Sequence, residues 1–263
     1  MPFRSALFIP CGNARAMEKA RTLEPDVLIF DLEDAVASEA RNAATAALAE
    51  ALRDGGLLAR RVLVRIHPGS LNAIHQALAG LPIDGLVVPK VDTPDDLRAV
   101  AHVWPGMPLW AMIETAKGVT RLAEIAAEPL AGLIAGPNDL RKDLHARPLP
   151  ERGDIAFALS QIVLYGRAND LIVLDGVFNA FRDDAGFAAD CAHGRALGFD
   201  GKTLIHPDQI EPCHRSFSPS QAEVAWAKAV VAAFAGSTAA VVPVRGEMVE
   251  RLHLAQAEAI LAV

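Results

Sequence analysis

Cysteine is scarce in this chain: 263 residues include only Cys11, Cys191 and Cys213, which lie far apart and form no CxxC pair. This usage favours a reduced intracellular protein with scattered thiols. Long apolar runs are also missing, since no stretch approaches the roughly 20 residues of a membrane span. The apolar segment at the N-terminus is too short for a signal peptide. We therefore expect a cytoplasmic protein without a membrane partner.

Positive charge is not in excess either. The net charge is −7 and the pI is about 5.6, which argues against a general nucleic-acid-binding surface but not against a local anion pocket. Hydrophobic residues make up 52% of the sequence and charged residues 22%. A large core is therefore available, and the composition is not that of a disordered chain. The length suits one barrel of roughly 250 residues with a short appendage.

Eight short apolar runs alternate with helical patterns along most of the chain. Each run is rich in Val, Ile, Leu and Phe, as expected of a strand that is buried on both faces. Eight strand–helix units are what a TIM (β/α)8 barrel requires, so we predict this α/β fold with a C-terminal helical extension. The predicted strands are residues 5–10, 27–32, 61–66, 85–90, 108–114, 131–137, 171–176 and 201–207.

Helical patterns fill the gaps between these runs. Asn13 and Ser38 are placed to begin helices, and Thr93 followed by Pro94 predicts an N-cap and a first-turn proline. The predicted helices are residues 13–23, 39–52, 70–78, 95–103, 115–127, 151–167, 183–197 and 207–213.

Two predicted connections, residues 141–150 and 174–184, are longer than the others. Long loops that follow barrel strands are usually lids or binding loops. The first is basic, with Arg141, Lys142 and Arg147. This favours a place for a phosphate or a carboxylate, and a solvated loop is the alternative.

The pattern changes after residue 215. A helix is predicted over residues 221–235, a link over 236–244 and a last helix over 248–261. These two helices are additional to the eight strand–helix units of the barrel. We therefore predict a barrel over residues 1–215 and an extension over 216–263 that packs on a neighbouring subunit of a homo-oligomer, a trimer or a hexamer.

Two acidic residues follow neighbouring predicted strands: Glu114 ends the fifth strand and Asp139 follows the sixth. Because parallel barrel strands end at one rim, the two carboxylates can converge. Two hard oxygen ligands, with positions left for water and substrate, suit Mg²⁺. Such an ion polarises a carbonyl and stabilises a developing enolate. Either carboxylate alone would more often be a cap or a surface charge, but the pair predicts a metal site.

Three carboxylates end the second strand within four residues: Asp31, Glu33 and Asp34. Placing them together is costly without a cation or hydrogen-bond donors. They could hold metal-bound waters or orient Arg65. The alternative is that one of them caps the next helix and another pairs with an arginine.

Three basic residues lie near predicted strand ends. Arg65 lies in an apolar run, where an unpaired charge would be very costly, and its planar fork matches a carboxylate at two points. It is a candidate for gripping a keto-acid substrate, and a structural pair with Asp31 or Glu33 is compatible with that role. Arg4, before the first strand, is a second candidate. Lys90, at the end of the fourth, would form a Schiff base only if its pKa were lowered, whereas nearby acids raise it.

Short motifs are distributed in order along nearly the whole chain. They are RSALFIP at 4–10, FDLEDAV at 30–36, VRI at 64–66, PK at 89–90, IETA at 113–116, GKTLIHP at 201–207, SFSP at 216–219 and EVAWA at 223–227. In this order they resemble the citrate lyase beta-subunit-like family, which comprises citryl-CoA and malyl-CoA lyase-like aldolases.

The resemblance implies a TIM barrel that uses Mg²⁺ to cleave or form a carbon–carbon bond beside an acyl thioester. The thioester would be of the citryl, malyl or citramalyl type, carried by CoA or by an acyl carrier, and the other product would be an α-keto acid. We expect Arg4, Pro89 and Lys90 to bind substrate as well. By position, the implied roles are metal binding for Glu114 and Asp139, keto-acid binding for Arg65, and support of the metal's waters for Glu33 and Asp34.

Two departures from the family pattern concern the reaction. Near the C-terminus the family's lyases often carry an aspartate in a methionine–aliphatic–aspartate motif, whereas this chain has Glu250 in GEMVER (246–251). An extra methylene moves the carboxylate by about a bond length, and a shift of about 1 Å can cost roughly 100-fold in rate. In the loop DGVFNAF (175–181), Ala180 replaces an acidic residue that is usual in relatives.

The leading hypothesis is a Mg²⁺-dependent carbon–carbon lyase of the citryl-CoA type. Glu250, from its own or a neighbouring chain, is the candidate acid/base group, and the basic loop at residues 141–147 is a candidate for contact with CoA phosphates. One alternative is a metal-dependent aldolase of free hydroxy-keto acids. Another is a non-catalytic subunit that binds acyl thioesters and acts only in a complex.

Overall fold

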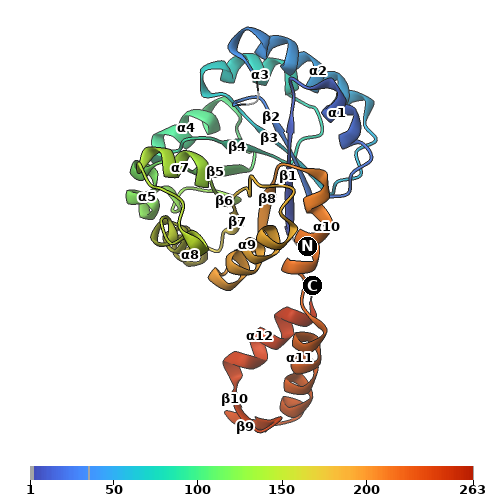
Figure 1. Cartoon of the computed structure of the whole chain (residues 1–263), viewed down its shortest axis with the longest axis vertical. Coiled ribbons are helices and arrows are strands. Elements are labelled where there is room, and N and C mark those ends of the chain that lie inside the picture. The colour runs from blue at the N-terminus through green and yellow to red at the C-terminus, as the bar shows by residue number, and fades with distance from the viewer. Residues whose placement is uncertain (1–2, 35, 263) are drawn as a thin grey trace.

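A closed parallel barrel forms most of the structure, a computed structural model that describes residues 3–34 and 36–262. Its eight strands hydrogen-bond in chain order, and β1 closes the ring by pairing with β8 (Figure 1). The predicted TIM (β/α)8 fold is therefore confirmed. The strands are β1 (Ser5–Pro10), β2 (Val27–Asp31), β3 (Arg61–Arg65), β4 (Gly85–Val88), β5 (Leu109–Ile113), β6 (Gly132–Ala135), β7 (Ile172–Asp175) and β8 (Gly201–Leu204).

Two sets of apolar side chains alternate along the strands, because successive residues of a strand point to opposite faces. One set includes Ile29 and Leu63, which cluster with Trp110 from β5. The other set includes Leu28 and Val64, which belong to a larger cluster with the surrounding helices. The barrel strands are therefore buried on both faces, as their composition predicted.

Helices cover the outside of the barrel (Figure 1). Two of the predicted starts are present: Asn13 accepts a hydrogen bond from the Ala16 N–H, and Thr93 caps a helix whose first residue is Pro94. The helices are α1 (Ala14–Ala20), α2 (Arg41–Asp54), α3 (Leu71–Leu78), α4 (Pro94–Val103), α5 (Ala116–Thr120), α6 (Leu122–Ile125), α7 (Pro137–Asp143), α8 (Ala156–Ala168), α9 (Asp184–Leu197) and α10 (Ile210–Phe217).

Three helix predictions need correction. The helix expected over 115–127 is two short helices, because the backbone at Arg121 leaves the helical region. The connection after β6 begins with α7, so the basic segment is helical as far as Asp143. The helix expected from residue 151 starts at Ala156, because Glu151 and Arg152 have left-handed φ values of 53° and 56°.

Buried ion pairs on the outer side of β7 and β8 connect these barrel strands to α9 and to the segment before α8. The fully buried Lys202 places its Nζ 2.8 Å from Asp175 Oδ2 and 2.5 Å from Asp190 Oδ2. Arg152 Nη1 lies 2.7 Å from Asp175 Oδ1. Since a buried charge without partners is very costly, these four side chains stabilise one another. They anchor the start of the loop after β7, which carries Asn179 into the cavity described below.

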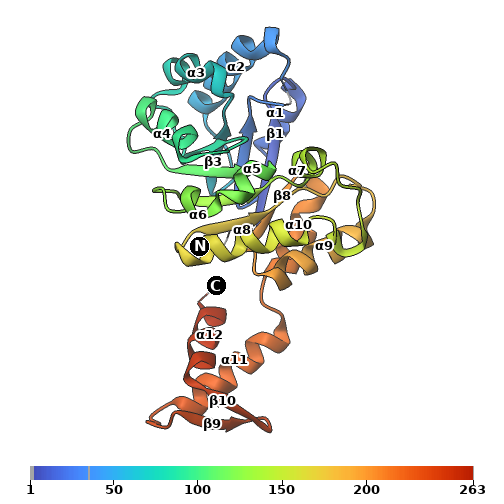
Figure 2. The same ribbon diagram turned by 90° about the vertical axis from the view of Figure 1, so that its left-hand side faces the viewer.

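The C-terminal segment projects from the barrel (Figure 2). It contains α11 (Gln221–Phe234), β9 (Val241–Val244), β10 (Glu247–Glu250) and α12 (Arg251–Leu261), with an apolar cluster of its own. The antiparallel β9–β10 hairpin corrects the prediction of a link over residues 236–244 followed by a helix from residue 248. Its turn uses Arg245 and Gly246 at φ 51° and 88°, the pair of positive values that a tight hairpin turn needs. Pro243 within the run obscured this strand.

Ser220 begins α11 with a reciprocal capping interaction. Its hydroxyl accepts the Glu223 N–H at 3.2 Å, and the Glu223 carboxylate accepts the Ser220 N–H at 2.7 Å. We expect Ser220→Ala to destabilise α11 by about 1 kcal/mol, measured as faster amide hydrogen exchange in its first two turns. Ser160→Ala, an exposed change within α8, should leave exchange in α11 unchanged. Equal exchange in both variants would contradict the assigned cap.

Within residues 3–34 and 36–262, the structure contains no helix with the length and apolar character that crossing a membrane requires.

Candidate active site

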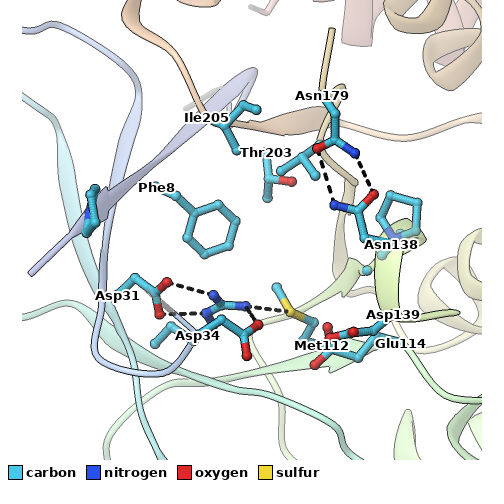
Figure 3. Close-up of a pocket in the computed structure, with 16 residues that line it drawn as sticks. Phe8, Asp31, Asp34, Met112, Glu114, Asn138, Asp139, Asn179, Thr203 and Ile205 are labelled. Atoms are coloured by element: carbon cyan, nitrogen blue, oxygen red, sulfur yellow. Dashed lines mark hydrogen bonds and ion pairs between the residues drawn. The ribbon is translucent and has the colours of Figure 1, made fainter. Parts of the chain in front are cut away.

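A cavity of about 320 Å³ opens at the C-terminal ends of the barrel strands (Figure 3). Its floor includes Asp31 and Arg65, which are hydrogen-bonding neighbours at the ends of β2 and β3. This is the end at which TIM barrels carry their chemistry. Its lining residues are Phe8, Pro10, Asp31, Asp34, Arg65, Met112, Glu114, Ala135, Gly136, Pro137, Asn138, Asp139, Val177, Asn179, Thr203 and Ile205.

Arg65 is held rigidly among acidic side chains. Its Nε and Nη2 donate to Asp31 at 2.8 and 2.7 Å, as Figure 3 shows. Its Nη1 lies 3.2 Å from Glu33 Oε2 and 3.4 Å from Asp34 Oδ2. Burial opposes the charge, but these carboxylates raise the pKa of Arg65 above its usual value. The pairing with Asp31 is the structural alternative considered above, and it leaves Nη1 in contact with Glu33, Asp34 and the Met112 sulfur, which is 3.7 Å away.

Lys90 connects the acidic residues that follow β2 with those after β5 and β6. Its backbone has a left-handed φ of 51°, and its Nζ donates to Glu33 and lies 3.4 Å from Asp34 and 3.7 Å from Asp139. Burial lowers the pKa of Lys90, but the hydrogen bond to Glu33 and the surrounding carboxylates outweigh it and raise the pKa. The ammonium therefore stays protonated, which is opposite to what a Schiff-base lysine needs.

Because the Lys90 amine remains charged, we expect no covalent adduct with keto acids. Incubation with glyoxylate or pyruvate and then borohydride should leave the mass of the Lys90 peptide unchanged. A reduced adduct at this lysine would contradict the assignment and establish Schiff-base chemistry.

Glu114 follows β5 and is almost completely buried, with 3% of its surface exposed. Its Oε1 accepts the Lys90 backbone N–H at 2.8 Å. Burial, with a further contribution from the charge on Glu33, raises the pKa of Glu114 from 4.5 to about 7. Gly136 faces this side chain so closely that a Cβ there would lie 2.4 Å from the Cβ of Glu114. The glycine therefore makes room for the carboxylate.

Asp139 lies in the first turn of α7 and lines the same cavity as Glu114 (Figure 3). Within the described part of the chain, no group of three or more His, Cys, Asp or Glu side chains could hold a metal ion. Two carboxylates on an open cavity fit an ion such as Mg²⁺, which is usually bound through one or two carboxylates and keeps several waters or substrate oxygens. The buried, partly uncompensated charge on Glu114 also favours a cation there.

Three predicted site residues lie elsewhere. Arg4 precedes β1 at the opposite end of the barrel, where its Nε and Nη2 bind Asp26 at 2.9 and 3.0 Å, so its position does not agree with a role in this cavity. Pro89 is buried next to Lys90 and is absent from the cavity lining. Glu250 ends β10 in the projecting segment (Figure 2), so within one chain it does not reach the cavity. A role for Glu250 therefore stays a prediction that needs a second subunit.

Several lining residues were not identified from the sequence. Asn138 and Asn179 exchange two amide hydrogen bonds at 2.8 and 3.2 Å, which join α7 to the loop after β7. Phe8 stacks under the Arg65 guanidinium at 4.8 Å. Asn138 directly follows a predicted strand and Asn179 lies three residues beyond another, so position after a strand end was a usable signal. That the two meet depends on the path of two separate loops.

The basic segment after β6 is partly neutralised. Arg141 Nε lies 2.6 Å from Asp154, which is itself buried. This pair ties α7 to the segment before α8. The Arg141 guanidinium is therefore committed to a structural contact, which leaves Lys142 and Arg147 as the cations of the expected phosphate-binding loop.

Residues 4–207 match the family model described as HpcH/HpaI aldolase/citrate lyase. The chain belongs to this family. It is 45% identical to a (3S)-malyl-CoA thioesterase of Cereibacter sphaeroides, over 99% of this chain and 94% of the relative. It is 32% identical to the citrate lyase subunit beta of Escherichia coli K12, over 97% of this chain and 93% of that one. The resemblance inferred from the motifs is thus confirmed.

A solved structure of the same family shares the fold. It is the CitE protein of Mycobacterium tuberculosis in complex with magnesium, acetoacetate and coenzyme A, which has a TM-score of 0.83 and 31% identity, over 99% of this chain and 97% of that one. A citrate lyase beta subunit of M. tuberculosis has been solved with oxaloacetate and magnesium, at a TM-score of 0.71 and 30% identity, over 83% of this chain and 98% of that one.

Proposed function

We propose that this protein is a Mg²⁺-dependent enzyme that acts on a malyl-type acyl-CoA and hydrolyses its thioester bond. The observation that carries the proposal is the meeting of Glu114, Asp139 and the Arg65–Asp31 pair on one small cavity at the catalytic end of the barrel. The 45% identity with a malyl-CoA thioesterase, over nearly the whole of both chains, favours hydrolysis.

Glu114 and Asp139 would hold the ion. When bound, Mg²⁺ would polarise the thioester carbonyl and neutralise negative charge on oxygen. The remaining roles belong to the chain's own side chains. Arg65 lines the cavity and supplies a positive charge for a carboxylate of the acyl group, and Asp31 fixes the plane of the guanidinium. The ammonium of Lys90 holds Glu33 and Asp34 in place.

Asp34 is the carboxylate available to activate water. It lines the cavity with about half of its side chain exposed, whereas Glu33 is buried. In the proposed reaction Asp34 accepts a proton from a water molecule as the water oxygen attacks the thioester carbon. The carbon–sulfur bond then breaks, and the CoA thiolate leaves and takes up a proton. The products are a free hydroxydicarboxylic acid and CoA.

Carbon–carbon cleavage is the second candidate, favoured by the citrate lyase beta relatives at 30–33% identity. It needs a base for the substrate hydroxyl, and the expected residue in the C-terminal motif is Glu250 rather than aspartate. It would release an acyl-CoA and an α-keto acid from the same cavity. An aldolase of free hydroxy-keto acids and a non-catalytic thioester-binding subunit would use the same residues without turning over malyl-CoA.

One assay separates these reactions. Purified protein is incubated with malyl-CoA and Mg²⁺; free CoA is measured with a thiol reagent, and acetyl-CoA and glyoxylate are measured by chromatography. We expect CoA and malate in equal amounts and no acetyl-CoA, with activity lost in EDTA and restored by Mg²⁺. Acetyl-CoA with glyoxylate would establish the lyase instead, and no turnover of malyl-CoA or citryl-CoA would refute both reactions.

A further inference from the structure

Asn138 and Asn179 form a cyclic amide pair in the lining of the cavity (Figure 3). Asn138 Nδ2 donates to Asn179 Oδ1 at 3.2 Å, and Asn179 Nδ2 donates to Asn138 Oδ1 at 2.8 Å. A primary amide has two N–H groups and an oxygen with two lone pairs. Each side chain therefore retains one N–H and one acceptor position, which make no other hydrogen bond within residues 3–34 and 36–262.

Both asparagines are held by ordered backbone. Asn138 lies in the first turn of α7, directly after Pro137. The loop that carries Asn179 approaches α7 closely at Gly176, where a Cβ would collide with the ring of Pro137. The buried Gln209 donates its Nε2 at 3.0 Å to the backbone carbonyl of the residue before Asn179. The amide pair is therefore positioned in advance of any ligand, as a recognition element should be.

The edge of the pair that faces Phe8 carries one donor and one acceptor. In Figure 3, Asn138 Nδ2 and Asn179 Oδ1 lie on this side. A carboxylate has no donor and a guanidinium has no acceptor, so either group would satisfy only half of this edge. A hydroxyl group satisfies both halves, because it accepts one hydrogen bond and donates another.

The other polar groups of the lining are less suited to a neutral hydroxyl group. The carboxylates only accept hydrogen bonds, and Arg65 only donates them. Thr203 is 1% exposed, and its hydroxyl already donates to the Asp175 carbonyl at 3.1 Å. Among the described residues that line the cavity, the asparagine pair is thus the uncharged group that offers both a donor and an acceptor.

We propose that the asparagine pair recognises the hydroxyl group of a hydroxyacyl thioester and selects this substrate over its deoxy analogue. The inference rests on the proposed function, because it places the acyl group in the cavity of Glu114 and Asp139. Asn138 directly precedes Asp139 on α7, so the pair lies on the side of the cavity where the ion would bind. The pair takes no part in the proton transfer assigned to Asp34, and it determines which acyl group is accepted.

Succinyl-CoA differs from malyl-CoA only by lacking the hydroxyl group, so the two substrates isolate this contact. The kcat/KM of the wild type should be at least about 10-fold higher for malyl-CoA, because the analogue leaves polar groups of the site unpaired. Asn138→Leu and Asn179→Leu keep the approximate size of the side chain but remove the amide. In each of them the two values should differ by less than about 3-fold. Because each amide orients the other, the double variant should lose no more of the preference than either single variant.

The ratio of the two kcat/KM values separates recognition from support of the fold. If the pair served only to join α7 to the loop after β7, its loss would lower both values alike and leave their ratio unchanged. Asn72→Leu, a change of an exposed asparagine on α3, is the matched control and should keep the preference of the wild type.

Binding of free malate and succinate, measured by titration calorimetry with Mg²⁺ present, tests the pair without turnover. We expect the wild type to bind malate at least about 10-fold more tightly than succinate, and both leucine variants to bind the two acids alike. A wild type without this preference would refute the assignment. If the wild type hydrolyses malyl-CoA and the variants keep the preference for the hydroxyl group, the assignment is wrong and the proposed function stands. If the preference for malate depends on the pair but no thioester is turned over, the proposed function fails and the assignment stands.

Discussion

Glu114→Gln should reduce turnover of malyl-CoA by about 1000-fold or more and, in metal-free buffer at pH 8, make the protein more stable. Gln keeps the shape of the side chain and can still accept the Lys90 N–H, but it lacks the negative charge that would bind the ion. Losing one group that stabilises charge in the transition state typically costs 100- to 1000-fold, and loss of the ion itself adds to that.

The gain in stability follows from the raised pKa of Glu114. Burial raises this pKa from 4.5 to about 7, so the folded state favours the protonated form. The stabilisation from that proton is present below pH 4.5 and is lost as the pH rises through 7. At pH 8 the neutral Gln should therefore increase the free energy of unfolding by about 3 kcal/mol, and at pH 4 it should have little effect. Urea unfolding at the two pH values in EDTA measures the difference.

Addition of Mg²⁺ should make the wild type more stable than Glu114→Gln at pH 8. It should stabilise the wild-type protein and leave Glu114→Gln unaffected, because an ion that binds only the folded state stabilises it. Glu124→Gln, an exposed glutamate on α6, is the matched control and should match the wild type throughout. Equal turnover in the wild type and Glu114→Gln would refute the metal site.

Arg65→Ala should destabilise the fold by about 3–5 kcal/mol as well as abolish activity. The change leaves the carboxylates of Asp31 and Glu33, which are 3% and 6% exposed, without the guanidinium that both contact. Removing one partner of a buried ion pair typically costs this much, since the other charge stays buried. Urea unfolding monitored by circular dichroism measures the loss.

Arg65→Lys separates the substrate role from the structural one. Lysine keeps a charge near Asp31 but cannot reproduce two parallel hydrogen bonds, so we expect a smaller loss of stability and a kcat/KM about 100-fold lower. Arg61→Lys, at the exposed start of the same strand, is the control and should change stability by less than about 0.5 kcal/mol. Full activity in Arg65→Lys would show that the guanidinium of Arg65 does not bind the substrate.

Local patterns allowed much of the barrel to be predicted. Apolar runs and cap residues such as Asn13 and Thr93 act within a few residues of the chain, so strand positions and helix starts could be read directly. Carboxylates after neighbouring strands were correctly expected to share one cavity, because parallel strands end at a common rim. The alternative pairing of Arg65 with Asp31 or Glu33, expected because a charge in an apolar run needs a partner, is present with both.

The role given to Arg4 did not agree with the structure, although its place before the first strand was available from the sequence. A residue just before β1 belongs to the amino-terminal end, away from the cavity. The β9–β10 hairpin was missed because a strand of four residues with a central proline has almost no local signal.

The succession of strands and helices along the chain could thus be predicted from residue types alone, since hydrogen bonding and alternation of apolar side chains are short-range effects. Ring closure between β1 and β8 decided the rest. It brings Phe8 next to Ile205 in the lining of the cavity at the barrel mouth. It is a contact between the two ends of the barrel sequence, and no local preference encodes it. The lining of this cavity therefore became visible only in the folded chain.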